Sequence, residues 1–419
     1  MYIRGKIKFD NILMALLVIN CFLCNLGLYN YRTSPAVMVS ICILMIYLFY
    51  IRSFSKKNLT AIEKFIIIFL LVISVSYAIN GIVYKVPTYI TCFILFGLIL
   101  PIYFIKVNRS EIKKIIGIFT QTTIICFLFI IIASFLVAPI TSEQYSGVFN
   151  NPNLLGECIS VVIISLIFQF ENARSYKYKL VILIIFGMST ALMFFSMSRT
   201  TLLSVGIIAI VYFAFNIKNK FNVKKKLIAF LLSILIMLPI TYGILNIVTP
   251  QISNIVGINL TEEYQSREKL GNVVDRTLDR YKKGIGDDRT FSSGRIEIWK
   301  EYAENLSVAG HDASKLNIEY NGEIIQANAH NSFLQISYHS GIISGICYIL
   351  ILLYVSISII KKFIKNRNID NNLLFGMMAV LSLFVYSSLS NIVIPTISFT
   401  MVPMWIIVLP LILSKKEES

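Results

Sequence analysis

Histidine is scarce in this chain, and its three copies are confined to one region. His311, His330 and His339 all lie in, or just after, a long polar loop. Cysteine is missing from that loop, because all seven cysteines fall inside apolar runs. A disulfide framework or a thiolate zinc site is therefore not implied, and Cys21-x-x-Cys24 is better explained as two small buried side chains than as a redox pair.

Charged residues are also few, at 14% of the chain, against 56% hydrophobic residues and a mean hydropathy of +0.74. This composition excludes a soluble globule. A membrane-spanning helix needs about 20 apolar residues, and the chain predicts twelve such spans, the first one retained: residues 11–28, 35–51, 62–82, 88–105, 113–138, 154–170, 178–196, 200–217, 226–248, 333–360, 372–390 and 395–413. The predicted fold class is therefore an all-α polytopic integral membrane protein.

The net charge of +16 raises the possibility of a nucleic-acid partner, but the positions of the charges argue against it. Lysine and arginine cluster in every second connection between the apolar runs, whereas the short connections in between carry only Arg32, Lys85 and Arg199. Short cytoplasmic loops of membrane proteins have this basic bias. The pattern predicts that both termini are cytoplasmic and that the long polar loop is extracytoplasmic, with the lipid bilayer rather than nucleic acid as the surrounding partner.

The long loop separates the chain into three predicted parts. Residues 1–248 form transmembrane helices 1–9, residues 249–332 form an extracytoplasmic loop domain, and residues 333–419 form helices 10–12. The loop carries 13 acidic residues against 10 basic ones, and its aromatic residues suggest a small folded surface rather than a linker. Two or three short helices are expected in it, one over residues 272–283 and one that begins near the N-cap Ser293, with an apolar stripe of Ile296, Trp299, Ala303 and Leu306.

Two arginines on the predicted outer side are candidates for binding an anion. Arg199 follows a tight turn between two spans, where it could also be an interfacial residue that reaches for water. Arg295 falls in the first turn of the predicted loop helix, where free N–H groups and a guanidinium would together bind phosphate. Its alternative is a surface ion pair with Asp287 or Asp288. These two adjacent carboxylates lack a suitably spaced third ligand, so no metal is predicted.

His330 immediately precedes the apolar run at 333–360 and is the candidate general base, because a neutral imidazole accepts a proton at physiological pH. Its alternative role is that of a capping or packing residue. The following span places Ser337, Gly341 and Gly345 on one face, which predicts close packing against another span. His339 would point away from His330 on a single helix, which argues against a two-histidine metal site.

A third outward feature is the turn from Gly147 to Glu157, which contains Asn-Pro-Asn before an apolar run. Asn153 is expected to cap the helix that follows. Glu157 is a carboxylate well inside a predicted span, and its structural explanation is stabilisation by the dipole of its own helix.

Together, these features resemble the superfamily of bacterial O-antigen ligases and Wzy-type O-antigen polymerases. The resemblance rests on Gly-x-Phe-x-Asn-Pro-Asn before span six, Ser-Arg after span seven, Ser-Gly-Arg-x-x-x-Trp in the long loop, and His-Asn-x-x-Leu leading into a glycine-rich span. It covers the chain from about Gly147 to Gly345. One departure is that the family's Gly-x-Gly between the last two motifs reads Ala309-Gly310-His311-Asp312 here.

The resemblance implies a fold similar to integral-membrane glycosyltransferases of the GT-C type, in the bacterial cytoplasmic membrane. It implies outward-facing transfer of a glycan from an undecaprenyl-pyrophosphate carrier to a hydroxyl of an acceptor glycan, without a metal or other cofactor. Arg199 and Arg295 would stabilise the pyrophosphate leaving group, and His330 would act as the base. Asn331, Asn153, Trp299 and His311 would bind substrate. Other polysaccharide-assembly proteins are a further class of partner.

Three functions compete on the sequence alone. Polymerisation of O-antigen or capsule repeat units is the favoured one, and a ligase that passes the glycan to a final acceptor is the first alternative. The second alternative is a transporter of lipid-linked oligosaccharides. Transporters of this size show paired halves and buried midplane charges, whereas here the large loop is placed asymmetrically and the candidate residues gather on one side. A non-catalytic scaffold is the least favoured interpretation.

Overall fold

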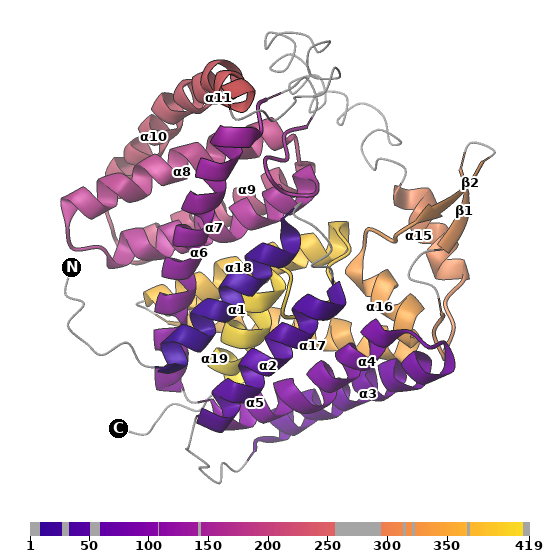
Figure 1. The fold of residues 1–419 in the computed structure, drawn as a ribbon. Coiled ribbons are helices and arrows are strands. Elements are labelled where there is room, and N and C mark those ends of the chain that lie inside the picture. Colours follow the sequence, from indigo (N-terminus) through magenta and orange to yellow (C-terminus); the bar gives the residue numbers. More distant parts are fainter. Residues whose placement is uncertain are drawn as a thin grey trace.

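The computed structural model describes residues 9–26, 33–50, 59–107, 109–140, 144–255, 295–312, 316–320, 323–366 and 369–413, which form a helical bundle (Figure 1). The first six helical stretches are α1 (Phe9–Asn25), α2 (Thr33–Tyr50), α3 (Ala61–Val83), α4 (Pro87–Ile94) continued by η1 (Leu95–Ile99) and α5 (Leu100–Lys106), α6 (Arg109–Val137) and α7 (Pro152–Asn172). The next are α8 (Tyr176–Ser196), α9 (Arg199–Lys218) and α10 (Val223–Gly243), which continues through η2 (Ile244–Val248) into α11 (Thr249–Ile255). The C-terminal part contains α15 (Arg295–Glu304), β1 (Leu316–Tyr320), β2 (Glu323–Ala327), α16 (Ser332–Ser340), α17 (Ile342–Lys365), α18 (Asn371–Leu389), η3 (Pro403–Val408) and α19 (Leu409–Leu413).

The predicted all-α polytopic fold is confirmed. Within the described residues, nine helices are long and apolar enough to cross a membrane, and three shorter apolar helices, Phe9–Asn25, Pro35–Tyr50 and Pro403–Leu413, occupy the other three predicted positions. Helix α7 is central, with 89% of its apolar window buried, whereas the helix that starts with α10 is peripheral, with only 22% buried. Its exposed Leu, Ile and Val side chains would contact lipid, because helices satisfy their own backbone groups in a bilayer.

Helix α15, the β1–β2 hairpin and α16 gather on one side of the bundle, here called the loop face (Figure 1). Antiparallel pairing joins Leu316 to Ala327 and continues to Tyr320 and Glu323. A separate small core of Ile298, Tyr302, Ile318, Ala329 and Tyr338 holds these elements together. The loop therefore contains the expected short helix at α15 and, in addition, a hairpin that the sequence analysis did not predict.

The loop helix α15 also buries a different set of side chains from the predicted apolar stripe. Ile298 and Tyr302 are the buried residues of α15, whereas Ile296 and Ala303 are exposed. The cause is the hairpin, because Tyr302 donates a hydrogen bond to Ala327 O (2.9 Å) and accepts one from the backbone N–H at residue 316 (3.2 Å). The predicted helix over 272–283 and the N-cap Ser293 lie outside the described residues.

The predicted span at 333–360 is divided by Gly341. Its φ of 88° ends α16 and starts α17 in a new direction, and a Cβ at this position would lie 2.1 Å from Val308 O. Gly345 then packs on Ser337, whose Oγ would lie only 1.8 Å from a Cβ there. The small residues therefore serve contact between α16 and α17, not between one continuous helix and another span, as the sequence had suggested.

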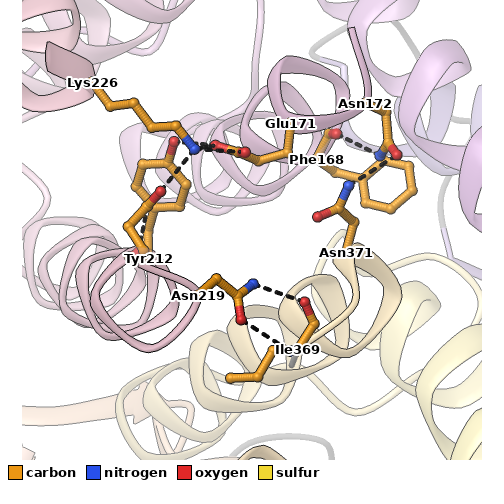
Figure 2. A network of polar contacts seen from close by, with 9 residues as sticks. Phe168, Glu171, Asn172, Tyr212, Asn219, Lys226, Ile369 and Asn371 are labelled. Carbon is orange, nitrogen blue, oxygen red and sulfur yellow. Dashed lines mark hydrogen bonds and ion pairs between the residues drawn. The ribbon is translucent and has the colours of Figure 1, made fainter. Parts of the chain in front are cut away.

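The opposite face of the bundle is fastened by a polar network that joins α7, α9, α10 and α18 (Figure 2). Lys226 Nζ contacts both carboxylate oxygens of Glu171 at 2.7 Å, and Tyr212 Oη donates to the same carboxylate. Nearby, Asn219 exchanges two hydrogen bonds with the backbone of Ile369 (2.9 and 3.0 Å). The network connects helices that are distant in sequence, at the end away from the loop face.

The Lys226→Met variant should lower the free energy of unfolding by about 3 kcal/mol, because it leaves a largely buried carboxylate without its cation. Thermal unfolding of the purified protein in detergent measures this as a lower midpoint. The double variant Lys226→Met/Glu171→Gln should recover most of the loss, since no uncompensated charge remains. A single variant as stable as the wild type would show that the ion pair is not structurally important.

Candidate active site

Helices α8 and α9 meet in a sharp turn that positions Arg199. Met197 ends α8 in the left-handed conformation (φ 51°), and Ser198 caps α9 by accepting a hydrogen bond from Thr201 N–H (3.4 Å). Arg199 is thus the first residue of α9, and its side chain is half-buried. The turn, rather than a flexible loop, determines where the guanidinium lies.

The Asn-Pro-Asn turn lies against this connection, although its cap differs from the expected one. Asn151, not Asn153, caps α7, with its Oδ1 accepting a backbone N–H at 2.9 Å. The reason is Pro152, which suits the first helical position because it has no N–H to leave unpaired, so that the cap falls just before it. Asn153 is exposed, and its Oδ1 accepts a hydrogen bond from Ser198 Oγ at 3.1 Å. The two motifs are therefore in direct contact.

Close packing of α7 on α9 depends on Gly156. A Cβ at this position would lie 1.9 Å from Thr201 Oγ1 and 3.0 Å from Thr201 Cβ. Thr201 cannot easily move its hydroxyl away, because this group is hydrogen-bonded to Ser198 Oγ (2.9 Å) and to Tyr386 Oη (3.0 Å). The start of α9, and Arg199 with it, is consequently fixed relative to α7.

Gly156→Ala should destabilise the protein by about 1–3 kcal/mol through overpacking. Gly206→Ala is the matched control, because Gly206 lies in α9 and a Cβ added there would meet nothing within 4 Å, and alanine favours a helix. Unfolding midpoints of both variants in detergent provide the comparison. Equal midpoints for the two would contradict the tight α7–α9 contact.

Arg295 is the first described residue of α15, and its side chain is half-buried. The helix is held in place by Trp299 as well as by Tyr302, since Trp299 Nε1 donates to Ala329 O at 2.8 Å. This bond joins the Arg295 helix to the residue immediately before His330.

The backbone of His330 is fixed from both sides in an uncommon conformation. Its φ is 47°, in the left-handed region that a non-glycine residue rarely adopts. On one side, Ala329 N–H donates to Gln335 Oε1 (3.0 Å). On the other side, Asn331 caps α16, accepting from the N–H groups of residues 333 and 334 (3.0 and 3.1 Å), and donates to Ser388 O (3.2 Å). Strained residues held this firmly are typical of functional sites.

Electrostatics link the three residues that the sequence singled out for catalysis. Burial lowers the pKa of Arg295, and the positive charge of Arg199 lowers it further. Burial also lowers the pKa of His330, and here the second cause is the charge of Arg295. Residues far apart in sequence are thus close enough to influence one another. The arrangement favours an anion beside the two guanidinium groups and a neutral imidazole next to them.

The four predicted substrate-binding residues are placed differently from one another. Asn153 touches the Arg199 turn, and Trp299 and Asn331 both position the backbone beside His330. His311 is engaged elsewhere: its Nε2 is 2.7 Å from Asn305 O, and its ring stacks on Tyr338 with centroids 4.2 Å apart. Substrate contact by any of them stays a prediction.

Sequence reasoning missed the contacts of two residues that the structure makes prominent. Gln335, buried in α16, bridges Ala329 N–H and His339 Nε2 (2.7 Å). Glu157 accepts hydrogen bonds from Ser398 Oγ (2.6 Å) and from the N–H and Oγ1 of Thr400 (3.0 and 2.9 Å), at the start of the last helical segment. These hydrogen bonds of the carboxylate thus go to the start of a distant helix, whereas the sequence had suggested stabilisation by its own helix. Neither contact leaves a local sequence signal.

The residues that the structure describes include no group of three or more His, Cys, Asp and Glu side chains that could hold a metal ion. Asp287 and Asp288, the adjacent carboxylates considered from the sequence, lie outside the described ranges.

Comparison with known families adds an independent observation. Residues 182–349 match the family model described as O-antigen ligase. This match over about two fifths of the chain supports the resemblance to the superfamily of O-antigen ligases and polymerases. The matched stretch begins in α8, ends in α17 and includes Arg199, Arg295 and His330. No curated protein matches the chain. The similarity supports a multi-pass membrane protein and, in general terms, glycan transfer of the O-antigen ligase or polymerase type on a lipid-linked glycan.

Proposed function

We propose that the protein polymerises polysaccharide repeat units of an O-antigen or capsule. It transfers the growing glycan from undecaprenyl pyrophosphate to a sugar hydroxyl on the outer face of the bacterial cytoplasmic membrane, without a metal. The observation that carries this proposal is the grouping of Arg199, Arg295 and His330, whose charges affect one another on the loop face. The basic residues of the opposite connections support the outward orientation of this face, with both termini on the cytoplasmic side.

The two arginines suit a pyrophosphate leaving group. The positive charge of Arg199 contributes to the lowered pKa of Arg295. A bound pyrophosphate would relieve the repulsion between the two charges, and guanidinium groups bind phosphate oxygens in a bidentate manner. Positive charges placed where negative charge develops stabilise a transition state. The leaving group is thus stabilised without a protonating acid.

His330 suits the role of general base towards the acceptor. Because its pKa is lowered, the imidazole is neutral and can accept a proton at neutral pH. His330 removes the proton from the acceptor hydroxyl, and the oxygen forms a bond to the anomeric carbon of the donor sugar. The bond from that carbon to the pyrophosphate oxygen breaks, and its electron pair leaves with undecaprenyl pyrophosphate between the arginines.

A reconstituted assay separates this function from its alternatives. The protein in nanodiscs is supplied with an undecaprenyl-pyrophosphate-linked repeat unit, and products are separated on a gel. A ladder of lengths supports a polymerase, whereas a single transfer to an added final acceptor would support a ligase. No transfer, together with movement of the lipid-linked sugar across vesicles, would put the transporter ahead of both.

The pH dependence of kcat/KM should report the lowered pKa of His330. Activity requires the neutral imidazole and falls as the pH drops through this pKa, so the acid limb of the wild-type profile should lie below the ordinary histidine value of 6.5. Arg295→Gln removes one of the two causes of the shift and should move the limb to higher pH, while burial keeps part of the shift. Lys300→Gln, which removes an exposed charge from the same helix, should leave the limb in place. A limb that does not move in Arg295→Gln would contradict the coupling.

A further inference from the structure

A cavity of about 460 Å³ opens beside the proposed active site but contains none of its three catalytic candidates. It is formed where the loop-face ends of α1, α3, α4, α7 and α16 meet the segment after α18. Its volume is within the range of about 300–1,000 Å³ that small-ligand pockets have. Its polar lining comprises Asn25, Thr88, Glu157, His339, Asn391 and Ser398, and two tyrosines, Tyr77 and Tyr89, contribute aromatic surface.

Two contacts place the cavity next to the catalytic residues. Leu154 in its wall follows Asn153, which accepts the hydrogen bond from Ser198 beside Arg199. On the other side, Ile392 N–H donates to Ser332 Oγ (2.9 Å), two residues after His330. The cavity is therefore connected to both the arginine turn and the histidine.

The chemistry of the lining is unsuited to the carrier lipid. No lysine or arginine is among the described residues that line it, and Glu157 offers carboxyl oxygens instead of positive charge to a pyrophosphate. A polyprenyl chain would in turn leave the buried Oδ1 of Asn391 without a hydrogen bond. A neutral ligand rich in hydroxyl groups satisfies both conditions.

The hydrogen bond between Gln335 and His339 indicates that the His339 side chain is also uncharged, like the ligand that the wall favours. Gln335 Oε1 accepts the Ala329 N–H, so Gln335 Nε2 is the atom that donates towards His339 Nε2 at 2.7 Å. His339 Nε2 must then be the acceptor, with the imidazole proton on Nδ1. In a protonated His339, the N–H at Nε2 would face the N–H of Gln335 Nε2, and neither group could accept a hydrogen bond.

The cavity wall contains one amide oxygen, that of Asn391, without a hydrogen-bond donor among the described residues. The Asn391 Oδ1 is buried, although Asn391 lines the cavity. A buried acceptor without a donor is costly. A ligand hydroxyl that donates to this oxygen would remove the cost.

We propose that this cavity binds the acceptor saccharide, with Asn391 accepting a hydrogen bond from a sugar hydroxyl and Tyr89 and Glu157 shaping its walls. The assignment rests on the proposed glycan transfer. It separates the two substrates, with the pyrophosphate of the donor between the arginines and the neutral sugar of the acceptor in the cavity. His330 is two residues before Ser332, whose hydroxyl accepts a hydrogen bond from Ile392 in the cavity wall.

The test measures binding rather than turnover. The probe is the repeat-unit oligosaccharide released from its carrier lipid, titrated calorimetrically into the protein in nanodiscs. Asn391→Ala should weaken saccharide binding about tenfold, the size expected for an unmade hydrogen bond in a closed site. Val393→Phe, which narrows the cavity without removing a polar group, should also weaken binding. Asn372→Ala is the matched control, because Asn372 lies on the opposite face.

Binding of undecaprenyl pyrophosphate, measured on the same variants, should be unchanged. The assignment is overturned if the wild type does not bind the oligosaccharide, if both cavity variants bind it as the wild type does, or if they lose the carrier lipid instead. If saccharide binding depends on Asn391 but no glycan transfer occurs, the cavity assignment holds and the proposed transfer reaction fails.

Discussion

His330→Asn is expected to reduce glycan transfer by about 10²–10⁴-fold, the contribution typical of a general base. Asparagine is chosen because it tolerates the left-handed conformation that His330 adopts (φ 47°) better than alanine does. The bonds that fix Ala329 and Asn331 on either side should therefore persist. The variant should fold and should still bind the carrier lipid, because the arginines remain in place.

The measurement is the initial rate of carrier-lipid release in nanodiscs, with the unfolding midpoint recorded on the same samples. Lys300→Gln is the control, since Lys300 is an exposed residue on the same helix as Arg295. A His330→Asn enzyme within a few-fold of the wild type would remove His330 from the chemistry.

Arg295→Lys and Arg199→Lys are expected to reduce kcat by about 10²-fold or more each. A lysine keeps the positive charge but cannot make the bidentate contact of a guanidinium with phosphate oxygens, and loss of one transition-state donor has an effect of this size. Because the charge of Arg199 lowers the pKa of Arg295, the two positions are coupled. The fold reduction of kcat in the double variant should therefore be smaller than the product of the two single fold reductions.

Steady-state rates for the three variants and for Arg174→Lys provide this comparison. Arg174 is an exposed residue after α7, at the end away from the loop face, and its substitution should have no effect. If both single variants kept full activity, the two arginines would not hold the leaving group.

The sequence predicted what depends on local composition. Apolar runs set the positions of the helices, because a span must be apolar over its length, and the described helices occupy the predicted positions. Arg199, Arg295 and His330 could also be chosen from the sequence, since each stands out as a polar residue at the edge of an apolar or helical stretch. The proximity of these three residues could not be predicted from the sequence, because it depends on how α9, α15 and α16 pack.

The errors have the same origin. The loop helix buries Ile298 and Tyr302 instead of the predicted stripe because an unpredicted hairpin covers that side. An Asn-Gly pair at residues 321–322, a strong signal for a hairpin turn, stands between the strands and could have revealed it. In contrast, the bond between Glu157 and Ser398 joins residues 241 positions apart, and nothing local to either of them indicates it.

The central claim is that the two arginines and His330 form one site for a pyrophosphate-linked glycan, and tryptophan fluorescence tests it most directly. The chain has only two tryptophans, so Trp405→Phe leaves Trp299, whose indole is hydrogen-bonded to Ala329 next to His330, as the sole reporter. Titration of undecaprenyl pyrophosphate into this protein in nanodiscs should give a saturable change. Adding Arg199→Gln or Arg295→Gln should raise Kd at least about tenfold, while His330→Asn should bind as tightly as the parent. A parent without any response, or arginine variants with unchanged affinity, would contradict the account.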